Sequence, residues 1–425
     1  MSLHNIYNGK ILLYLFAIAL YLPMIFTNVL TILLTLYILL NFRKINLKKT
    51  LNKKSVIVFF SMFFLIFIGF FYDISSDGVL NDLEKKLSFI ILTFSILVMD
   101  VKKEDVRRIL ALFFLSGILF TSLAICIGLS RYLSTGSLQF ITNHGLSLNI
   151  GLHATYLSMY LLFSLAYPVL YYESTKKQIV RRTIIFFSIL TVIFIILLSV
   201  RIVWGILLLF ITFWVVSVLR SRKLELKRSF LYLSGFIIVI FLLFNFVSPL
   251  KERLKEVINF NSNYNISKTW KPNVNEVWGG RGIRLLIWES SIELIREHPL
   301  VGYGSTKEVQ GRLNGNYIKN EIGPLLFLMN NRGKVFNAHN QYFEEVLKFG
   351  LILGLIFPFL LIIIAISSYK QQSTLGLYFV IIISGISLTE TILELNKGIV
   401  FFTFFLALIL SNSERPYCKS VISLS

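Results

Sequence analysis

Apolar runs close to 20 residues long recur along the whole chain, and this pattern constrains the fold more than any other feature. About 20 apolar residues in a helix cross the roughly 30 Å of hydrocarbon in a bilayer. Of the 425 residues, 56% are hydrophobic and only 15% are charged, whereas about 25% are charged in ordinary soluble domains. The sequence therefore predicts an all-α polytopic membrane protein.

The apolar runs between polar breaks predict about 12 transmembrane helices. The first two runs are alternatively one helix kinked near Pro23, because proline is tolerated within membrane helices. The expected spans are residues 9–25, 28–42, 55–72, 86–100, 108–129, 149–171, 181–200, 202–219, 229–247, 341–367, 375–391 and 397–411.

The basic residues follow the pattern expected of membrane topology. The formal net charge is +20, but Lys and Arg fall in short clusters between apolar runs rather than on one folded face, which argues against a nucleic-acid partner. The clusters lie in alternate connections, such as 43–54 and 220–228. The positive-inside rule then places both termini in the cytoplasm. No cleavage signal follows the first run, so we expect the first helix to be retained.

One long polar stretch divides the chain into three parts. Residues 1–247 form a transmembrane bundle of about nine spans, residues 248–340 form a large extracytoplasmic loop, and residues 341–425 form the last three spans and a cytoplasmic tail. Within the loop, residues 284–298 predict an amphipathic helix that ends before Pro299 and lies along the membrane or over the mouth of the bundle. Its apolar face comprises Ile283, Leu286, Ile287, Ser290 and Leu294. Residues 302–316 are rich in glycine and polar residues and predict loop.

The large loop is basic and contains no aspartate, although it holds thirteen Lys and Arg residues. Divalent metals in sugar-transferring enzymes are usually held by carboxylates, so we expect neither a metal site nor another cofactor. Arginine forks match phosphate oxygens well, which favours an anionic, phosphate-bearing ligand. The alternative is that these arginines solvate the loop or pair with its glutamates. The arginines concerned are Arg281, Arg284, Arg296, Arg312 and Arg332.

Two further residues stand at membrane boundaries. Arg201 lies between two apolar runs at the outer face, where the topology rule disfavours positive charge, so it is either functional or extends to lipid headgroups. His339 stands where the polar loop gives way to the tenth span, at the N-terminal end of a helix. The helix dipole there disfavours the protonated imidazole. His339 is thus a candidate base, or else a structural hydrogen-bonding residue.

Four features occur together in the order found in one family. They are an arginine at the outer end of a span (Arg201), the stretch RGIRLLIWESSIELIREHPLVGYG, the motif HNQY at His339 and Asn340, and a glycine-containing helix start at 348–354. The chain resembles the O-antigen ligase and polymerase family of membrane glycosyltransferases. The second stretch supplies the motif residues Trp288, Pro299, Gly302 and Gly304.

The resemblance implies a fold similar to the GT-C class and metal-independent, inverting transfer at the outer face of the bacterial inner membrane, with the large loop periplasmic. Arg201 and Arg284 correspond to arginines that hold the diphosphate of an undecaprenyl-diphosphate-linked glycan donor. In the alternative alignment to the family motif, Arg281 rather than Arg284 is the matching arginine. His339 corresponds to the residue that activates the acceptor hydroxyl.

Three functions stay open at the level of sequence. A ligase moves O-antigen to lipid A core, a polymerase adds the same donor to another lipid-linked glycan, and a transporter moves the lipid-linked sugar. We expect acceptor contacts from Tyr303 and from residues 314–317 and 330–337. Transporters tend to place charge within spans and often contain internal repeats. Few spans here are charged and no repeat is found, which disfavours transport.

Overall fold

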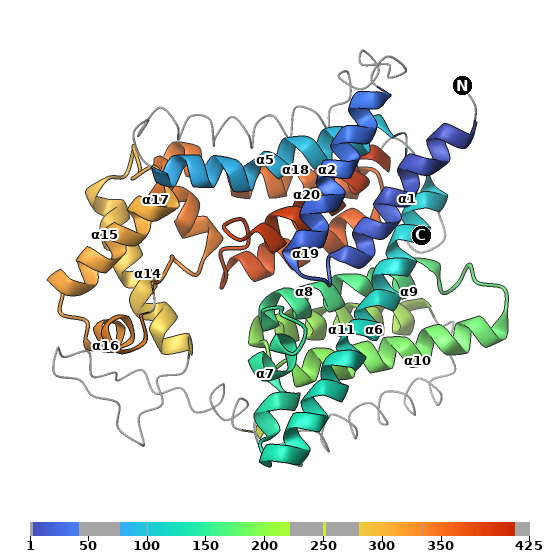
Figure 1. Cartoon of the computed structure of the whole chain (residues 1–425), viewed down its shortest axis with the longest axis horizontal. Coiled ribbons are helices and arrows are strands. Elements are labelled where there is room, and N and C mark those ends of the chain that lie inside the picture. Colours follow the sequence, from blue (N-terminus) through green and yellow to red (C-terminus); the bar gives the residue numbers. More distant parts are fainter. Residues whose placement is uncertain are drawn as a thin grey trace. The chain divides into compact units, whose positions relative to one another are not determined.

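The computed structural model describes residues 3–41, 77–99, 101–221, 250–251, 280–333 and 335–412, and every element in these ranges is a helix. The predicted spans 55–72 and 229–247 lie outside the described residues. The elements (Figure 1) are α1 (Leu3–Ala19), α2 (Met24–Leu40), α5 (Asp77–Val98), α6 (Lys103–Thr135), η2 (Leu138–Ile141), α7 (Asn143–Leu148), α8 (Ala154–Ser164), α9 (Ala166–Tyr171), α10 (Gln178–Leu197), α11 (Arg201–Ser221), α14 (Gly280–Glu297), α15 (Thr306–Lys319), α16 (Gly323–Arg332), α17 (Gln341–Gly354), α18 (Ile356–Lys370), α19 (Thr374–Ser387) and α20 (Asn396–Asn412).

The apolar composition of these helices fits a polytopic membrane protein. By length and hydropathy, three described stretches can cross a membrane, namely α6, the run from Ala154 to Tyr171, and α10. Shorter apolar helices, including α2, α19 and most of α20, accompany them. The first two predicted spans are separate helices, α1 and α2, because the chain leaves helical geometry before Pro23. The count of about 12 spans stays a prediction.

The predicted tenth span, residues 341–367, is not one straight helix. It is a bent pair, α17 and α18, whose axes meet at 73°. Within α17, Gly350 has a φ of 74°, a left-handed conformation that glycine adopts at little cost. The sequence did not predict this bend, because an apolar run records lipid exposure or burial but not a break in backbone direction. The bent pair passes the length and hydropathy test for a span when its two helices are taken together.

The chain folds as two compact units. The first contains Met1–Leu20, Met24–Ile109 and Ser262–Ser425, and the second contains Tyr21–Pro23 and Leu110–Asn261. In the first unit α5 packs along α20, and α18 packs along α19. In the second unit α8 packs against α10 and α11. Tilted and edge-on aromatic rings pack in the second unit around Tyr21, Phe113 and Tyr160.

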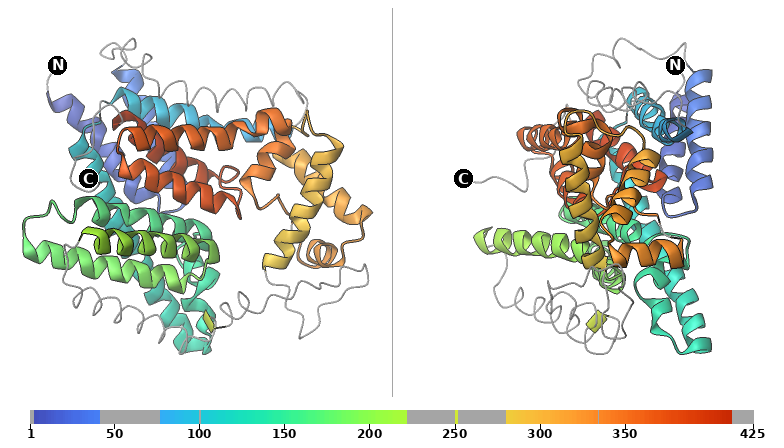
Figure 2. Two further views of the ribbon diagram at one scale, coloured as in Figure 1. Left: turned by 180° about the vertical axis from the view of Figure 1, so that it is seen from behind. Right: turned by 90° about the vertical axis from the view of Figure 1, so that its left-hand side faces the viewer.

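The large loop contains three described helices rather than one. α14 matches the predicted amphipathic helix, and its apolar face is buried as expected, with Ile287 fully inaccessible. That face packs on α15 and α17. The location of α14 along the membrane or over the bundle mouth stays a prediction. Figure 2 shows α14, α15 and α16 together beside α17.

The prediction of loop at residues 302–316 is also wrong, because α15 covers Thr306–Lys319. Val309, Leu313 and Tyr317 lie on one face of this helix and are fully buried against α14 and α17. Ser305 caps its N-terminus by accepting a hydrogen bond from the Glu308 amide. The helix was not predicted because glycine and polar residues dominate this segment, although its few apolar residues recur at helical spacing.

Candidate functional site

His339 stands immediately before α17, as the sequence predicted. Asn340 caps this helix, because its side-chain oxygen accepts hydrogen bonds from the amides of Tyr342 and Phe343 at 2.9 and 3.2 Å. His339 itself has a φ of 45°, which is uncommon for residues other than glycine and is often found at functional positions. The HNQY motif therefore combines a helix cap with a backbone turn that presents the imidazole.

Glu390 joins the predicted base to a predicted phosphate ligand. One carboxylate oxygen lies 3.6 Å from Nδ1 of His339, and the other lies 2.5 Å from a terminal guanidinium nitrogen of Arg284. Nε of Arg284 also donates to the carbonyl of Thr389 at 3.0 Å. The structure thus brings together His339, which precedes α17, and Arg284 of α14. Glu390, in the segment between α19 and α20, joins them.

The exposure of these side chains bears on access by substrate. His339 keeps 30% of its side-chain surface and Arg284 keeps 28%, whereas Glu390 keeps 15%. Nδ1 of His339 is buried, so Nε2 is the ring nitrogen that can meet a substrate hydroxyl. The 3.6 Å separation from Glu390 exceeds hydrogen-bonding distance, and catalytic contacts of this kind often shorten when substrate binds.

Sequence reasoning missed Glu390. It stands at the outer end of the predicted eleventh span in SLTETILELNKG, and an acidic residue at a membrane boundary is a signal that could have marked it. Its contacts join positions 106 and 51 residues apart in sequence, and the periodicity of a single chain does not encode such contacts. Glu390 is the residue that the structure adds to the candidate site.

Two further predicted phosphate ligands are Arg281 and Arg201. Arg281 lies in the first turn of α14, three residues before Arg284, and its side chain is outside the described part of the chain. Arg201 is the first residue of α11 in the second unit and is half-buried. The amides at a helix N-terminus and an arginine together make a positive position suited to an anion. The role of Arg201 stays a prediction.

The glycines of the PLVGYG segment let its backbone approach α17 and hydrogen-bond to it directly. The amides of Tyr303 and Gly304 donate to the carbonyls of Leu347 and Lys348 at 2.7 and 2.9 Å. A Cβ at Gly302 would lie 2.3–2.4 Å from the backbone of residues 347 and 348. Gly304 has a φ of 87°. The motif glycines are therefore needed for close contact with α17.

Trp288 fixes the other side of the same interface. Its ring lies edge-on to Phe343 of α17, with 6.3 Å between centroids. It packs at the edge of the core shared by α14, α15 and α17. Trp288 therefore holds α14, which carries Arg284, against α17, the helix that follows His339.

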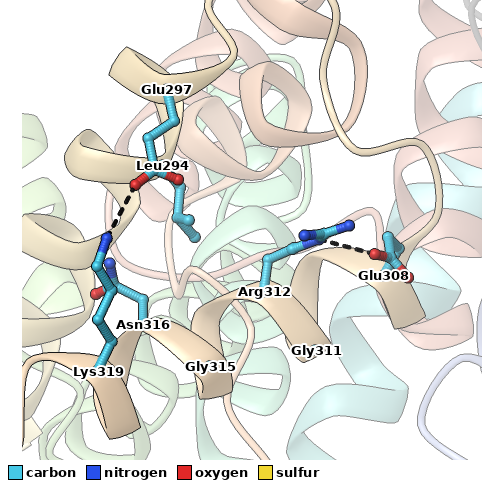
Figure 3. Close-up of a pocket in the computed structure, with 8 residues that line it drawn as sticks. All are labelled: Leu294, Glu297, Glu308, Gly311, Arg312, Gly315, Asn316 and Lys319. Carbon is cyan, nitrogen blue, oxygen red and sulfur yellow. Dashed lines mark hydrogen bonds and ion pairs between the residues drawn. The ribbon is translucent and has the colours of Figure 1, made fainter.

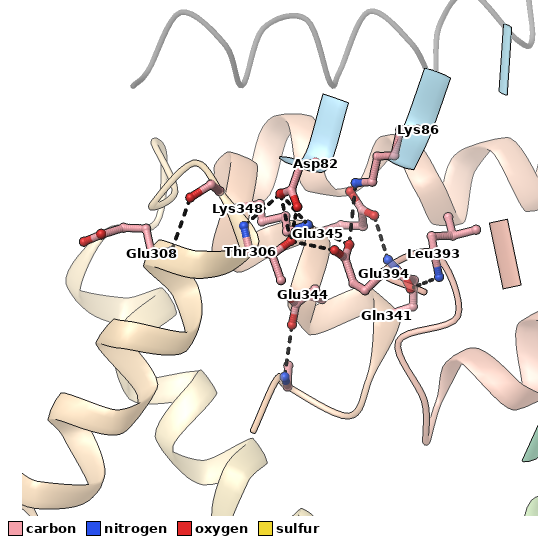
Figure 4. Close-up of polar contacts among 12 residues, drawn as sticks. Asp82, Lys86, Thr306, Glu308, Gln341, Glu344, Glu345, Lys348, Leu393 and Glu394 are labelled. Atoms are coloured by element: carbon pink, nitrogen blue, oxygen red, sulfur yellow. Dashed lines mark hydrogen bonds and ion pairs between the residues drawn. The ribbon is translucent and has the colours of Figure 1, made fainter. Parts of the chain in front are cut away.

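A buried cluster of charged residues lies at the junction of α5, α15, α17 and the α19–α20 segment (Figure 4). The ammonium of Lys348, which is completely inaccessible, lies 2.6 Å from Glu394 and 3.4 Å from Asp82. The ammonium of Lys86 lies 3.5 Å from Glu394. The hydroxyl of Thr306 lies within 2.9 Å of both carboxylates. We call Asp82, Lys86, Thr306, Lys348 and Glu394 the anchor cluster.

The anchor cluster fixes the elements that carry the candidate site. Beside it, Oε1 of Gln341 accepts a hydrogen bond from the amide of Leu393 at 2.8 Å, and Glu344 accepts one from the amide of Ala338 at 3.0 Å. The first bond ties the start of α17 to the segment that carries Glu390, and the second holds the residues before His339 against α17. Sequence analysis expected few charged spans, and α17 is one that buries three charged residues, Glu344, Glu345 and Lys348.

Charge balance determines the protonation of the carboxyl groups in the anchor cluster. Burial raises the pKa of the Asp82 carboxyl, but Lys348, Lys86 and hydrogen bonds from Thr306 outweigh burial and lower the pKa to about 2. Burial likewise opposes ionisation of Glu394, yet Lys348 and Lys86 lower its pKa below the ordinary value. Both carboxylates are thus ionised at neutral pH.

In the described residues, no three His, Cys, Asp or Glu side chains lie together as metal ligands would. Between the carboxylates of Asp82 and Glu394, where two acids might hold a cation, the ammonium of Lys348 is the cation.

Comparison with known proteins identifies the central region of the chain. No curated protein matches the sequence. Residues 186–358 match the family model described as O-antigen ligase. The matched region runs from within α10 to the start of α18 and includes Arg201, Arg281, Arg284 and His339. The resemblance stated from the motifs is thereby confirmed. Residues 186–358 of this chain are therefore similar to the O-antigen ligase family.

Proposed function

We propose that this protein is a glycosyltransferase of the O-antigen ligase type. It moves a polysaccharide from undecaprenyl diphosphate to lipid A core at the outer face of the bacterial inner membrane. The observation that carries the proposal is the joining of His339 and Arg284 by Glu390. This places a base next to a guanidinium, which is the pairing that displacement of a diphosphate leaving group requires.

In the proposed reaction, Nε2 of His339 accepts the proton of the acceptor hydroxyl. The hydroxyl oxygen attacks the anomeric carbon from the side opposite the diphosphate, and the bond from that carbon to the diphosphate oxygen breaks. The electron pair of that bond leaves on the diphosphate, and the anomeric configuration inverts. No nucleotide is consumed, since the sugar on the carrier is already activated.

Glu390 has two functions in this mechanism. Its carboxylate faces Nδ1, so it holds the imidazole with Nε2 toward the substrate and stabilises the imidazolium that forms, as the acid of a catalytic triad does. It also orients Arg284, whose guanidinium opposes the charge that develops on the departing diphosphate. Arg201 contributes a second positive charge, and Arg281 is the alternative to Arg284.

General base catalysis typically contributes about 10²–10⁴ in rate, and fixed charges aimed at the developing anion contribute a similar factor or more. Loss of Arg284 is therefore expected to slow transfer at least as much as loss of His339.

The test is transfer by the purified chain from an undecaprenyl-diphosphate-linked glycan in EDTA. Lipid A core and a lipid-linked repeat are offered as separate acceptors. Product on lipid A core that disappears in His339→Ala supports the ligase. Longer lipid-linked chains would make the protein a polymerase instead. A folded protein that binds donor but transfers it to neither acceptor would overturn the enzyme and favour a transporter.

A further inference from the structure

A groove lies between α14 and α15, within the first unit and outside the reaction centre described above (Figure 3). Its volume is about 390 Å³. Leu294 and Glu297 form the α14 wall. The α15 wall and floor are Glu308, Gly311, Arg312, Gly315, Asn316 and Lys319.

Two exposed glycines open the groove. Gly311 and Gly315 lie one helical turn apart on the same face of α15, and a Cβ added at either one would meet no atom within 4 Å. Neither glycine has a left-handed φ or a close neighbour that requires it. Glycine is among the least favourable residues within a helix. No packed neighbour therefore requires glycine at these two positions. Their lack of side chains instead leaves the groove above α15 open.

The walls of the groove alternate hydrogen-bond donors with acceptors. Nε of Arg312 lies 2.9 Å from Glu308, and the ammonium of Lys319 lies 3.5 Å from Glu297 across the groove. The amide of Asn316 donates to Glu293 at 3.0 Å. These ion pairs are exposed, and exposed pairs are weak and readily exchange partners. A sugar hydroxyl both donates and accepts hydrogen bonds. Neighbouring hydroxyls of a sugar ring can therefore bond to these donors and acceptors, while the apolar C–H face of the ring packs on Leu294.

The groove and the reaction centre share one helix. Arg284 and Leu294 are ten residues apart on α14, which corresponds to about 15 Å at a rise of 1.5 Å per residue. A chain of a few sugar units can span such a distance. A glycan whose end reacts at His339 can thus have its body held between α14 and α15.

We propose that this groove is a subsite for a polyhydroxylated glycan chain, an inference that rests on the proposed glycosyl transfer. The chain belongs either to the acceptor or to the donor, since both present hydroxyls of the same chemistry. The groove binds that chain several residues away from the reacting bond and so sets affinity and glycan preference rather than the rate of the chemical step.

The kinetic test fills the groove without touching the reaction centre. Gly311→Leu and Gly315→Leu place a bulky side chain in open space, while Gly311→Ala and Gly315→Ala keep most of the groove. Gln310→Leu changes another position of α15 that does not line it. We expect the leucine variants to raise KM for one substrate about tenfold while kcat stays within about twofold. The alanine variants should raise KM much less than the leucine variants do, and Gln310→Leu should match the wild type.

Varying each substrate in turn identifies the source of the chain. A raised KM for lipid A core assigns the groove to the acceptor, and a raised KM for the lipid-linked glycan assigns it to the donor. Unchanged KM values for both substrates in both leucine variants would overturn the subsite while leaving the proposed function standing.

A binding measurement tests the glycan subsite independently of the proposed glycosyl transfer. Lipid-free core oligosaccharide and the glycan released from the donor are each tested by saturation-transfer NMR against the purified His339→Ala chain. We expect one of them to gain saturation, and we expect adding Gly311→Leu, but not Gly311→Ala, to abolish it. This result is independent of turnover, so an inactive wild type would sink the proposed function alone. No saturation by either glycan, or saturation that survives Gly311→Leu, would sink the subsite.

Discussion

Glu390 contacts both groups that the proposed reaction uses, and this double contact explains the local chemistry better than either pair does alone. A lone carboxylate beside a histidine would orient it, and a lone carboxylate beside an arginine would neutralise it. Because one side chain does both, the base and the phosphate ligand are fixed relative to each other. Their relative position is what an in-line displacement depends on.

Arg284 offers the sharpest single-residue prediction. We expect Arg284→Gln to lower kcat/KM for transfer about 10²–10³-fold, because a fixed positive charge is lost from the leaving group. Arg284→Lys should recover only part of this loss, since an ammonium lacks the planar fork. Arg296→Gln, on the exposed part of the same helix, is the matched control and should be neutral. Steady-state transfer kinetics would contradict the assignment if Arg284→Gln behaved like the control.

Asp82 makes stability depend on pH in a defined direction. Its pKa falls to about 2 in the fold, from an ordinary value near 3.8. A lowered pKa gives stability that is present above the ordinary value and lost as pH falls toward the folded value. The contribution is about 2 kcal/mol.

We therefore expect the thermal midpoint in detergent to fall between about pH 4 and pH 2 for the wild type. Asp82→Asn should be less stable at pH 7 and should show a flatter pH dependence. Glu84→Gln, an exposed acid on the same helix, is the control and should follow the wild type. Equal pH slopes for Asp82→Asn and the wild type would show that this carboxylate is not held by Lys348 and Lys86.

At the scale of elements, the bend between α17 and α18 and the PLVGYG segment form one structure. The amide of Leu351 donates to the carbonyl of Pro299 at 2.8 Å, so the segment fits against the break at Gly350. A Cβ at Gly350 would lie 2.1 Å from the carbonyl oxygen of Leu300. The bend is thus held by backbone contacts that only glycine permits.

Alanine substitutions distinguish the glycines at the contact between PLVGYG and α17 from the exposed glycines of α15. We expect Gly302→Ala and Gly350→Ala each to destabilise the fold by about 1–3 kcal/mol, because the added methyl meets backbone. Gly311→Ala should instead be neutral or stabilising, by up to about 1 kcal/mol, since it meets nothing and favours the helix. Thermal midpoints of the three variants compare them directly. Equal losses in all three would refute the steric argument.

The sequence predicted correctly those helices that a local pattern of apolar residues marks. The apolar runs located α10, α11, α19 and α20 within about four residues and α1, α2 and α6 within about six. The apolar face of α14 was correct residue by residue. The helix α15 was missed because glycine and asparagine dominate its composition while its apolar stripe has only a few members. The bend at Gly350 was missed because hydropathy does not report φ.

At the scale of the whole molecule, the long-range contacts were beyond prediction. Asp82 lies outside the large loop in sequence, yet it binds Thr306 of that loop, 224 residues away. Glu390 and Glu394 come from a short connection between spans, and they hold the candidate site and the anchor cluster. Such pairings arise from how the helices pack, and no spacing within one helix encodes them. Arg201, in the second unit, stays a predicted member of the site.

The central claim is that His339 and Glu390 act as one catalytic unit, and a double-mutant cycle on transfer tests it most directly. The four proteins are the wild type, His339→Ala, Glu390→Gln and the double variant, all compared by single-turnover transfer with donor bound. Residues that act as a unit lose little more together than the more damaging change does alone. We predict that the double variant is as slow as His339→Ala. Rate losses that multiply across the cycle, or a His339→Ala protein that transfers at the wild-type rate, would contradict the account.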